Sequence, residues 1–353
     1  MRDAYIVSSV RTPGCRRGRG AFNQTRPEDL LSQAMTAAAD NIKLDKALVD
    51  DVMTGCAFPE AEQGINVSRI ALLMAGYPKQ TSGAVVNRFC SSGLEAIALS
   101  AMKIKCGWTE IAMGAGLESM SIVPMGGNLP RPHPEWAKKD ADVYISMGIT
   151  AENVASRYNI SREDQDKFGY DSQMKAAKAQ KEKLFTEIIP TTATRFVNKN
   201  GLLERETFIQ DFDDGVRADT TVEGLSKLRP AFKAGGSVTA GNSSQTTDGA
   251  AATIVASEDA CKKYNLKPLA RIVAYTVAGC EPDEMGVGPK YAIPKVLKIA
   301  GMTLDQIELI ELNEAFASQA LHCIRELGLT ERMDIINVHG GACALGHPLG
   351  CTG

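Results

Sequence analysis

Cys90 is the residue of this sequence best placed to do chemistry. It stands where an apolar strand pattern at residues 83–86 gives way to two serines, a glycine and a helical pattern at residues 94–102. A thiol at the start of a helix meets free backbone N–H groups and the positive end of the helix dipole, which favour an anion. We therefore expect a lowered pKa for the Cys90 thiol and a nucleophilic thiolate. An inert, buried cysteine is the alternative.

The four histidines are the candidate bases for that thiol. His347 lies between a glycine and a proline in a glycine-rich loop. If the two halves of the chain pack about a pseudo-twofold axis, this loop faces Cys90 and His347 takes its proton. A turn-stabilising role is the alternative for His347, and we expect His322 to be structural or exposed. Asn313, at the end of an expected strand, can either cap a helix or donate a hydrogen bond to an oxyanion.

Length, composition and charge narrow the class of protein. The 353 residues suffice for a large core or for two or three packed domains. The net charge of -3 argues against a nucleic-acid or membrane-surface partner. Nine scattered cysteines without a CxxC pair suit free thiols in a reducing compartment better than a zinc site. We therefore expect a cytoplasmic protein with no bound metal and no membrane-spanning helix, which would need roughly 18 consecutive apolar residues.

Short apolar strand patterns alternate with helical patterns through the first 120 residues, which predicts an α/β sheet with helices on its faces. The strands are expected at residues 4–10, 51–56 and 109–116, and the helices at residues 27–41 and 66–74. The segment 114–119 superficially resembles a dinucleotide-binding loop. It lacks the third glycine, and a proline follows where a helix is required, so we expect no nucleotide site there.

In residues 121–245 the regular alternation of strand and helix patterns stops. Prolines and glycines interrupt regular structure at first, and helices are expected at residues 150–158 and 161–183. The small, polar segment 235–245 would let a ligand approach the backbone, with a flexible loop as the alternative. We expect this insertion to form a subdomain that binds a ligand over the sheet.

The second half of the chain repeats the strand patterns of the first. The paired patterns are residues 4–10 with 269–275, residues 51–56 with 307–312, and residues 85–89 with 335–338. A duplicated α/β unit is therefore predicted. The expected domains are residues 1–120 with 246–268, residues 121–245, and residues 269–353. By this symmetry the second unit lacks a last helix and one or two strands, so we expect the recorded chain to be truncated.

Three motifs together resemble those of the thiolases: residues 87–93 (NRFCSSG), residues 313–317 (NEAFA) and residues 340–348 (GGACALGHP). The resemblance extends over nearly the whole chain and is strongest to the degradative 3-ketoacyl-CoA thiolases. Biosynthetic acetoacetyl-CoA thiolases often carry a histidine where this chain has Ser146. The resemblance implies a five-layer αβαβα fold of duplicated α/β domains with an inserted loop subdomain.

The resemblance also implies a ping-pong reaction with coenzyme A as a substrate and no further cofactor. Cys90 would attack the 3-keto carbonyl of a 3-ketoacyl-CoA while His347 activates the thiol. Acetyl-CoA would leave as an enolate, and a second CoA would take the acyl group from the cysteine. Asn313, through a water, and His347 would line an oxyanion hole. The residues matched to CoA-binding positions are Arg217, Leu228, Ala240, Ser244, Met147, Ala315 and Phe316.

One departure from the family pattern concerns a second reactive cysteine, which thiolases carry in a C-x-G motif. The sequence ends before that motif, and Cys343 and Cys351 stand elsewhere. We therefore expect the chain as written to acylate poorly or to stop before the C–C step. An acetoacetyl-CoA thiolase and a catalytically inactive CoA-binding subunit stay open as alternatives. The resemblance implies a homodimer or homotetramer, with a multifunctional β-oxidation subunit as a further candidate partner.

Overall fold

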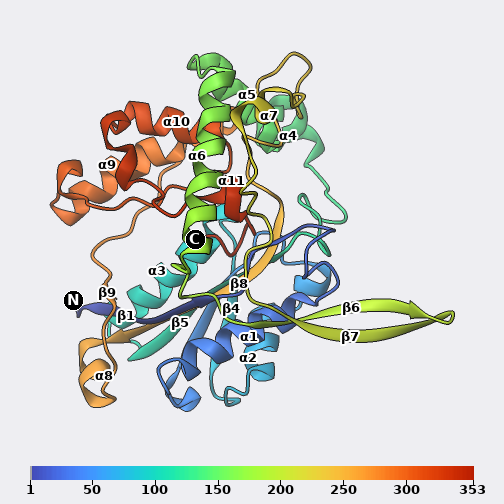
Figure 1. Cartoon of the computed structure of the whole chain (residues 1–353). Helices are drawn as coiled ribbons and strands as arrows, with labels where there is room; N and C mark the ends of the chain where they lie inside the picture. Colours follow the sequence, from blue (N-terminus) through green and yellow to red (C-terminus); the bar gives the residue numbers. More distant parts are fainter. Residues whose placement is uncertain (1) are drawn as a thin grey trace.

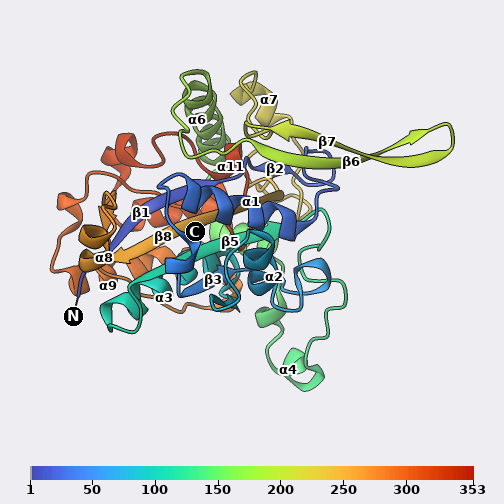
Figure 2. The ribbon, with the colours of Figure 1, turned by 90° about the horizontal axis from the view of Figure 1, so that it is seen from below.

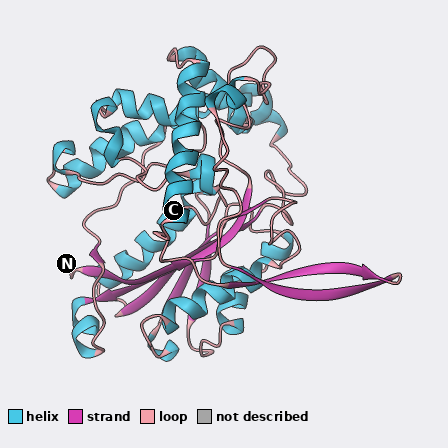
Figure 3. Cartoon of the chain, viewed as in Figure 1, coloured by secondary structure: helices cyan, strands magenta, loops and turns pink. Residues whose placement is uncertain are grey.

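One large mixed sheet forms the base of the molecule (Figures 1 and 3). The structure, a computed structural model, describes residues 2–353. Seven strands occur in the order β4-β3-β5-β8-β1-β9, with β2 pairing to β8. Their bounds are β1 Ala4–Arg11, β2 Cys15–Arg16, β3 Asp51–Gly55, β4 Ser82–Val86, β5 Ile111–Ser119, β8 Thr247–Ser257 and β9 Ala270–Arg271. Strand β3 runs parallel to both β4 and β5, whereas β8 runs antiparallel to β5 and β1.

Helices cover both faces of this sheet because its central strands are apolar on both sides. Along β5, Met113 and Ala115 pack in the cluster that holds helix α1 (Pro27–Asp40) and helix α2 (Val67–Met74). Ala112, which precedes Met113 and points to the opposite face, packs with Ala101 and Ile104 of helix α3 (Ser92–Lys105). The segment 114–119 therefore lies inside a buried strand.

The insertion contributes four helices and a hairpin to the described chain. The helices are α4 Pro134–Lys139, α5 Met147–Arg157, α6 Arg162–Lys181 and α7 Val222–Ser226. The hairpin pairs β6 (Thr191–Lys199) with β7 (Leu202–Gln210), where no strands were expected, and reaches far beyond the rest of the molecule (Figure 2). The expected cap of α6 is present, because the Ser161 hydroxyl accepts the Asp164 N–H at 3.0 Å.

The second half of the chain does not form the second sheet that the repeat predicts. Of residues 269–275, only Ala270–Arg271 is a strand, and it extends the first sheet beside β1. Residues 307–312 and 335–338 meet in a single parallel bridge, Ile310 with Ile336. Parallel strands are stable inside a sheet with both faces covered, and within residues 2–353 no third strand lies beside this pair. Val273 and Leu309 accordingly remain 48% and 57% exposed.

Helices dominate this second half (Figure 1). They are α9 Gly288–Ala300, α10 Ala317–Glu326 and α11 Ala342–Leu345, after α8 (Glu258–Lys263) at the end of β8. Short 3₁₀ turns lie at Lys46–Leu48, Ala61–Gln63, Phe89–Ser91, Ala141–Tyr144, Pro282–Val287, Leu304–Gln306 and Thr330–Ile335. All nine cysteines are free thiols.

Residues 2–353 contain neither a helix suited to span a membrane nor a cluster of metal-ligating side chains. None of the helices there combines the length and the apolar character needed to span a membrane. In the same part of the chain, no group of three or more His, Cys, Asp or Glu side chains is placed to hold a metal ion.

Gly55 is expected to tolerate no side chain, because α3 begins directly against it. A Cβ at Gly55 would lie 2.3 Å from the carbonyl carbon of Ser92 and 2.5 Å from the nitrogen of Gly93. We expect Gly55→Ala to lower the free energy of unfolding by about 1–3 kcal/mol, since backbone cannot yield easily. Urea denaturation measures this change. The matched control is Gly279→Ala, where a Cβ meets no atom within 4 Å; equal losses in both variants would contradict the prediction.

Candidate active site

Cys90 lies in the 3₁₀ turn Phe89–Ser91, between the end of β4 and the start of α3. Hydrogen bonds from side chains next to the turn stabilise it. The Ser92 hydroxyl accepts the Arg88 N–H at 2.8 Å and donates to the Phe89 carbonyl at 2.6 Å. The Asn87 side chain accepts the Phe89 N–H at 2.8 Å, and Phe89 has a φ of 43°. This tight turn places Cys90 at the edge of the sheet.

The expected lowering of the Cys90 pKa is wrong. Burial, as the largest cause, and the carboxylate of Glu118 together raise the pKa of the Cys90 thiol to about 11, and a backbone hydrogen bond opposes them only in part. The physical reason is the environment of the thiol, which packs on Ala57, Met120 and Leu349. An apolar surrounding disfavours the thiolate more than the helix start favours it. Cys90 is therefore protonated at neutral pH and needs a base.

His347 is a buried, neutral imidazole with both ring nitrogens in hydrogen bonds. Burial lowers its pKa to about 4. Nε2 lies 3.3 Å from the amide nitrogen of Asn313, and Nδ1 lies 2.5 Å from the hydroxyl of Thr352. The backbone N–H of His347 donates to the Gln245 carbonyl and to the Thr247 hydroxyl, both at 3.0 Å. A neutral imidazole fixed in this way can accept a proton.

The loop that carries His347 packs directly against the strand ends and the helix start that surround Cys90. A Cβ at Gly93 would lie 3.0 Å from the carbonyl oxygen of Cys351. The buried carboxylate of Glu118 accepts the N–H groups of Ala57 and Gly350, both at 2.8 Å. Glu118 thus joins the end of β5, the segment after β3 and the His347 loop. The structure brings together the two loops that the pseudo-twofold argument places face to face.

Asn313 and Glu314 hold the other side of this loop. The carboxylate of Glu314 accepts hydrogen bonds from Ser172 at 2.6 Å, from the amide of Asn337 at 2.8 Å and from the N–H of Cys343 at 3.1 Å. Burial raises the pKa of Glu314. The amide oxygen of Asn313 is buried without a hydrogen-bond partner. Glu314 is therefore a structural anchor, and Asn313 keeps hydrogen-bonding capacity for a ligand.

Several residues expected to bind CoA lie next to this group. The Ser244 N–H donates to the Ala315 carbonyl at 2.9 Å, which joins the segment 235–245 to the residues after Asn313. The ring of Phe316 stands edge to face with that of Phe232, with centroids 5.8 Å apart. Phe232 in turn covers Gly148, because a Cβ there would lie 2.0 Å from the Phe232 ring, and Met147 is the adjacent residue. These side chains line one continuous region.

Leu228 and Ala240 belong to the outer part of the same region. A Cβ at Gly241 would lie 2.7 Å from the Leu228 side chain, so Leu228 packs beside Ala240. Leu228 and Ala240 are both exposed. Arg217 is exposed as well, and its backbone N–H donates to the side chain of Gln173 at 2.8 Å. The structure therefore places a cation at the surface of the insertion.

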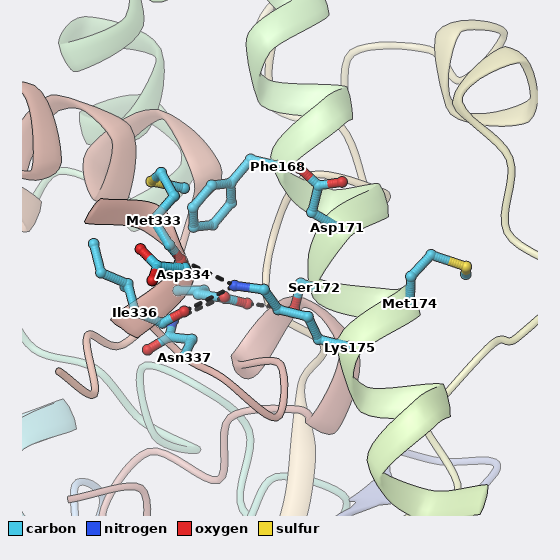
Figure 4. A pocket seen from close by; sticks show the side chains of 10 residues that line it. Phe168, Asp171, Ser172, Met174, Lys175, Met333, Asp334, Ile336 and Asn337 are labelled. Atoms are coloured by element: carbon cyan, nitrogen blue, oxygen red, sulfur yellow. Dashed lines mark hydrogen bonds between the residues drawn. The ribbon is translucent and has the colours of Figure 1, made fainter. Parts of the chain in front are cut away.

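A cavity of about 330 Å³ opens between α6 and the 3₁₀ turn Thr330–Ile335 (Figure 4). Lys175 extends across it and donates to the carbonyl of Ile336 at 2.8 Å and to that of Met333 at 3.4 Å. Glu314 borders this cavity, whereas Cys90 and His347 do not. The cavity is therefore separate from the thiol.

Two residues that contact the site were not singled out as site residues from the sequence. Glu118 ends a strand pattern, and its link to the His347 loop is a long-range contact that no local pattern reveals. Thr352 offers one usable signal, since a hydroxyl five residues after a histidine in a tight loop can fold back onto the ring. His322 is buried and stacks on Tyr158 with ring centroids 3.7 Å apart, as a structural histidine does.

An α/β fold with a cysteine, a neutral histidine and an amide on packed loops defines an enzyme of covalent group transfer. The family model "Thiolase, N-terminal domain" matches residues 4–259, and "Thiolase, C-terminal domain" matches residues 266–353. The chain belongs to the thiolase family, and it is an acyltransferase by that membership. The resemblance drawn from three motifs is thereby confirmed.

Named relatives and solved structures agree with this assignment. The 3-ketoacyl-CoA thiolase of Bacillus subtilis is 47% identical over 100% of this chain and 90% of its own length. The crystal structure of the dimeric peroxisomal thiolase of Saccharomyces cerevisiae has a TM-score of 0.90 and 38% identity, covering 100% of this chain and 88% of that chain. Human mitochondrial 3-ketoacyl-CoA thiolase in complex with CoA has a TM-score of 0.86 and 38% identity, covering 100% and 89%. The expected thiolase fold is confirmed.

Proposed function

We propose that this chain is a 3-ketoacyl-CoA thiolase that uses CoA to cleave a 3-ketoacyl-CoA into acetyl-CoA and a shortened acyl-CoA. The observation that carries the proposal is the packing of the Cys90 turn against the loop of His347, a neutral base with Asn313 on its Nε2. The name and 47% identity of the Bacillus subtilis relative support the choice of substrate.

Cys90, His347 and Asn313 divide the first half-reaction between them. The thiol gives its proton to Nε2 of His347 while the sulfur attacks C3 of the substrate and forms a C–S bond. The contact of Asn313 with Nε2 is long at 3.3 Å, so the substrate oxygen can take over the amide N–H as negative charge develops on it. The C2–C3 bond then breaks, and its electron pair leaves with acetyl-CoA as an enolate. The enolate takes up the proton that His347 received, which returns the imidazole to its neutral form.

The second half-reaction returns the enzyme to its starting state. The thiol of a second CoA loses its proton to the neutral ring of His347 and attacks the acyl carbon. The C–S bond to Cys90 breaks, and the leaving Cys90 sulfur takes that proton from His347. The backbone N–H of Cys90 is available to the thioester oxygen at the start of α3. No step of this half-reaction needs a group besides CoA, Cys90 and His347.

Neither of the cysteines near His347 suits the protonation of the enolate. Cys343 is 3% exposed, and its Sγ donates to the carbonyl of Glu314 at 3.7 Å. Burial raises the pKa of Cys351 to about 12. We therefore assign the acyl-transfer steps to Cys90, His347 and Asn313, and we assign no acid role to Cys343 or Cys351.

The region beside Asn313 is the proposed CoA site. Small residues and backbone groups of the segment 235–245 permit close approach of a ligand, and exposed Arg217 supplies a cation for phosphate groups. The residues assigned to this site are Arg217, Leu228, Ala240, Ser244, Met147, Ala315 and Phe316. We also propose a homodimer or homotetramer, since the yeast structure similar to this chain is described as dimeric, and a cytoplasmic location, which the nine free thiols favour.

Thiolysis of two substrates tests the proposed function. The protein is mixed with CoA and either acetoacetyl-CoA or a longer 3-ketoacyl-CoA, and loss of the ketoacyl absorbance is followed. Faster cleavage of the longer substrate supports the proposal. Cleavage of acetoacetyl-CoA alone would replace it with an acetoacetyl-CoA thiolase. CoA binding by calorimetry, without turnover and without an acylated cysteine, would assign the chain to a binding role.

Asn313→Ala is expected to slow acylation of the protein by roughly 10²–10³-fold, because it removes a donor for the developing oxyanion. Binding of CoA should change little, since that donor acts on the reacting oxygen. Acylation is measured as the mass increase of the intact chain at timed quenches. Asn41→Ala, at an exposed position after α1, is the control. Equal acylation rates in both variants would remove Asn313 from the oxyanion role.

A further inference from the structure

We propose that Thr352 is a positioning residue that fixes the tautomer of His347, so that Nε2 is the nitrogen that accepts the Cys90 proton. The inference rests on the proposed function only in taking His347 as the base for Cys90. No motif assigns Thr352 a role, and its hydroxyl contacts His347 and Pro348.

The direction of the hydrogen bonds at Thr352 determines which ring nitrogen carries the proton. The Thr352 hydroxyl donates to the carbonyl of Pro348 at 3.0 Å. A hydroxyl has one proton, so it can only accept in its second contact, with Nδ1 of His347 at 2.5 Å. We therefore assign the hydrogen to Nδ1. Because the imidazole is neutral at neutral pH, Nε2 then has a free lone pair.

The contact on the opposite side of the ring requires the same tautomer. The amide nitrogen of Asn313 lies 3.3 Å from Nε2, and an amide nitrogen only donates. Nε2 must accept there, which again leaves the proton on Nδ1. The two contacts come from different segments of the chain and agree.

The position of Thr352 is set by the short loop that begins at His347. The backbone N–H groups of Cys351 and Thr352 donate to the Pro348 carbonyl at 2.9 and 3.0 Å. The same carbonyl accepts the Thr352 hydroxyl, so loop and side chain form one closed network. Glu118 holds the loop from the other side through the Gly350 N–H. A loop fixed at these points presents the hydroxyl to Nδ1 without a large entropy loss.

Loss of the hydroxyl should disturb the base rather than the fold. Without it, the buried Nδ1–H has no acceptor, only the Asn313 contact still favours hydrogen on Nδ1, and the tautomer with hydrogen on Nε2 gains population. That tautomer cannot take the thiol proton. By the usual effect of removing such a partner, we expect Thr352→Val to slow reactions of Cys90 at pH 7 by about 10–100-fold.

The test compares the full chain with Thr352→Val, which keeps the shape, and Thr352→Ser, which keeps the hydroxyl. Alkylation of Cys90 by iodoacetamide is followed by peptide mass spectrometry between pH 6 and 10. We expect Thr352→Val to lose the base-assisted rate at pH 7 and to recover only at high pH. We expect Thr352→Ser to retain at least half of the rate. Equal pH profiles in the unchanged chain and in Thr352→Val, or equal losses in both variants, would overturn the proposal.

A second measurement reads the tautomer itself. Nitrogen NMR of protein labelled at its four histidines distinguishes Nδ1–H from Nε2–H without any substrate. The proposal requires Nδ1–H in the unchanged chain and a shift toward Nε2–H in Thr352→Val; Nε2–H in the unchanged chain refutes it. Failure of thiolysis with these tautomers in place would refute the proposed function alone. If His347→Asn leaves Cys90 alkylation unchanged, His347 is not the base and both proposals fail.

Discussion

Cys90→Ser is expected to reduce thiolysis by roughly 10⁴-fold or more, the scale on which removal of a nucleophile acts. A serine hydroxyl beside His347 is a far weaker nucleophile than a thiol at the same pH, because its proton is much harder to remove. The burial that raises the pKa of the Cys90 thiol to about 11 would penalise an alkoxide still more. Steady-state thiolysis and the intact mass after addition of 3-ketoacyl-CoA measure the effect.

The control for this variant is Cys106→Ser. Cys106 is an exposed cysteine that ends α3, at the opposite end of the helix from Cys90. It should leave both turnover and acyl-enzyme mass unchanged. If Cys90→Ser still accumulates a covalently acylated chain at the rate of the Cys106→Ser protein, the acyl group is carried elsewhere and the proposed mechanism is wrong.

His347→Asn is expected to lower acylation near neutral pH by about 10²–10⁴-fold, the usual contribution of a general base. Its clearest sign is the pH dependence. The reactive pair in the unchanged chain is a protonated thiol and a neutral imidazole, with a pKa of about 11 for Cys90 and of about 4 for His347. The acylation rate should therefore be nearly flat between pH 6 and 9. In His347→Asn only the thiolate reacts, so the rate should rise about tenfold per pH unit.

The pH range of this experiment follows from the sign of the His347 shift. Its pKa in the folded chain, about 4, is depressed below the ordinary value of 6.5. The neutral ring therefore contributes stability above pH 6.5, and this contribution is lost as the pH falls from 6.5 through 4. Rates should be measured above pH 6 for that reason. A flat profile in His347→Asn would show that another group removes the Cys90 proton.

The sequence alone predicted strands of the large sheet and the family because both depend on short stretches of consecutive residues. Strand β5 has consecutive apolar residues because both of its faces are buried. Helix α1 has apolar residues at helical spacing because one of its faces is buried. The NRFCSSG motif is specific because the turn around Cys90 uses its own side chains, such as Ser92, to satisfy the backbone. Such features need no knowledge of distant residues.

The errors arose where distant residues decide the outcome. The Cys90 pKa depends on Glu118 and on apolar neighbours from other segments, which override the local effect of a helix start. The strand patterns at residues 307–312 and 335–338 have the right composition, yet strand formation requires neighbours, and they meet in one bridge. The β6–β7 hairpin was missed although Asn200-Gly201 lies at its turn, a common hairpin signal.

Glu118 has a consequence for the motions of this protein. Its carboxylate holds Ala57 and Gly350 at once, so any opening that releases the Gly350 amide also leaves a buried carboxylate short of a partner. Partial detachment of the His347 loop therefore costs free energy. We expect this loop and the segment after β3 to open in one step. In hydrogen–deuterium exchange, the amides of Ala57 and Gly350 should accordingly lose protection in one cooperative event.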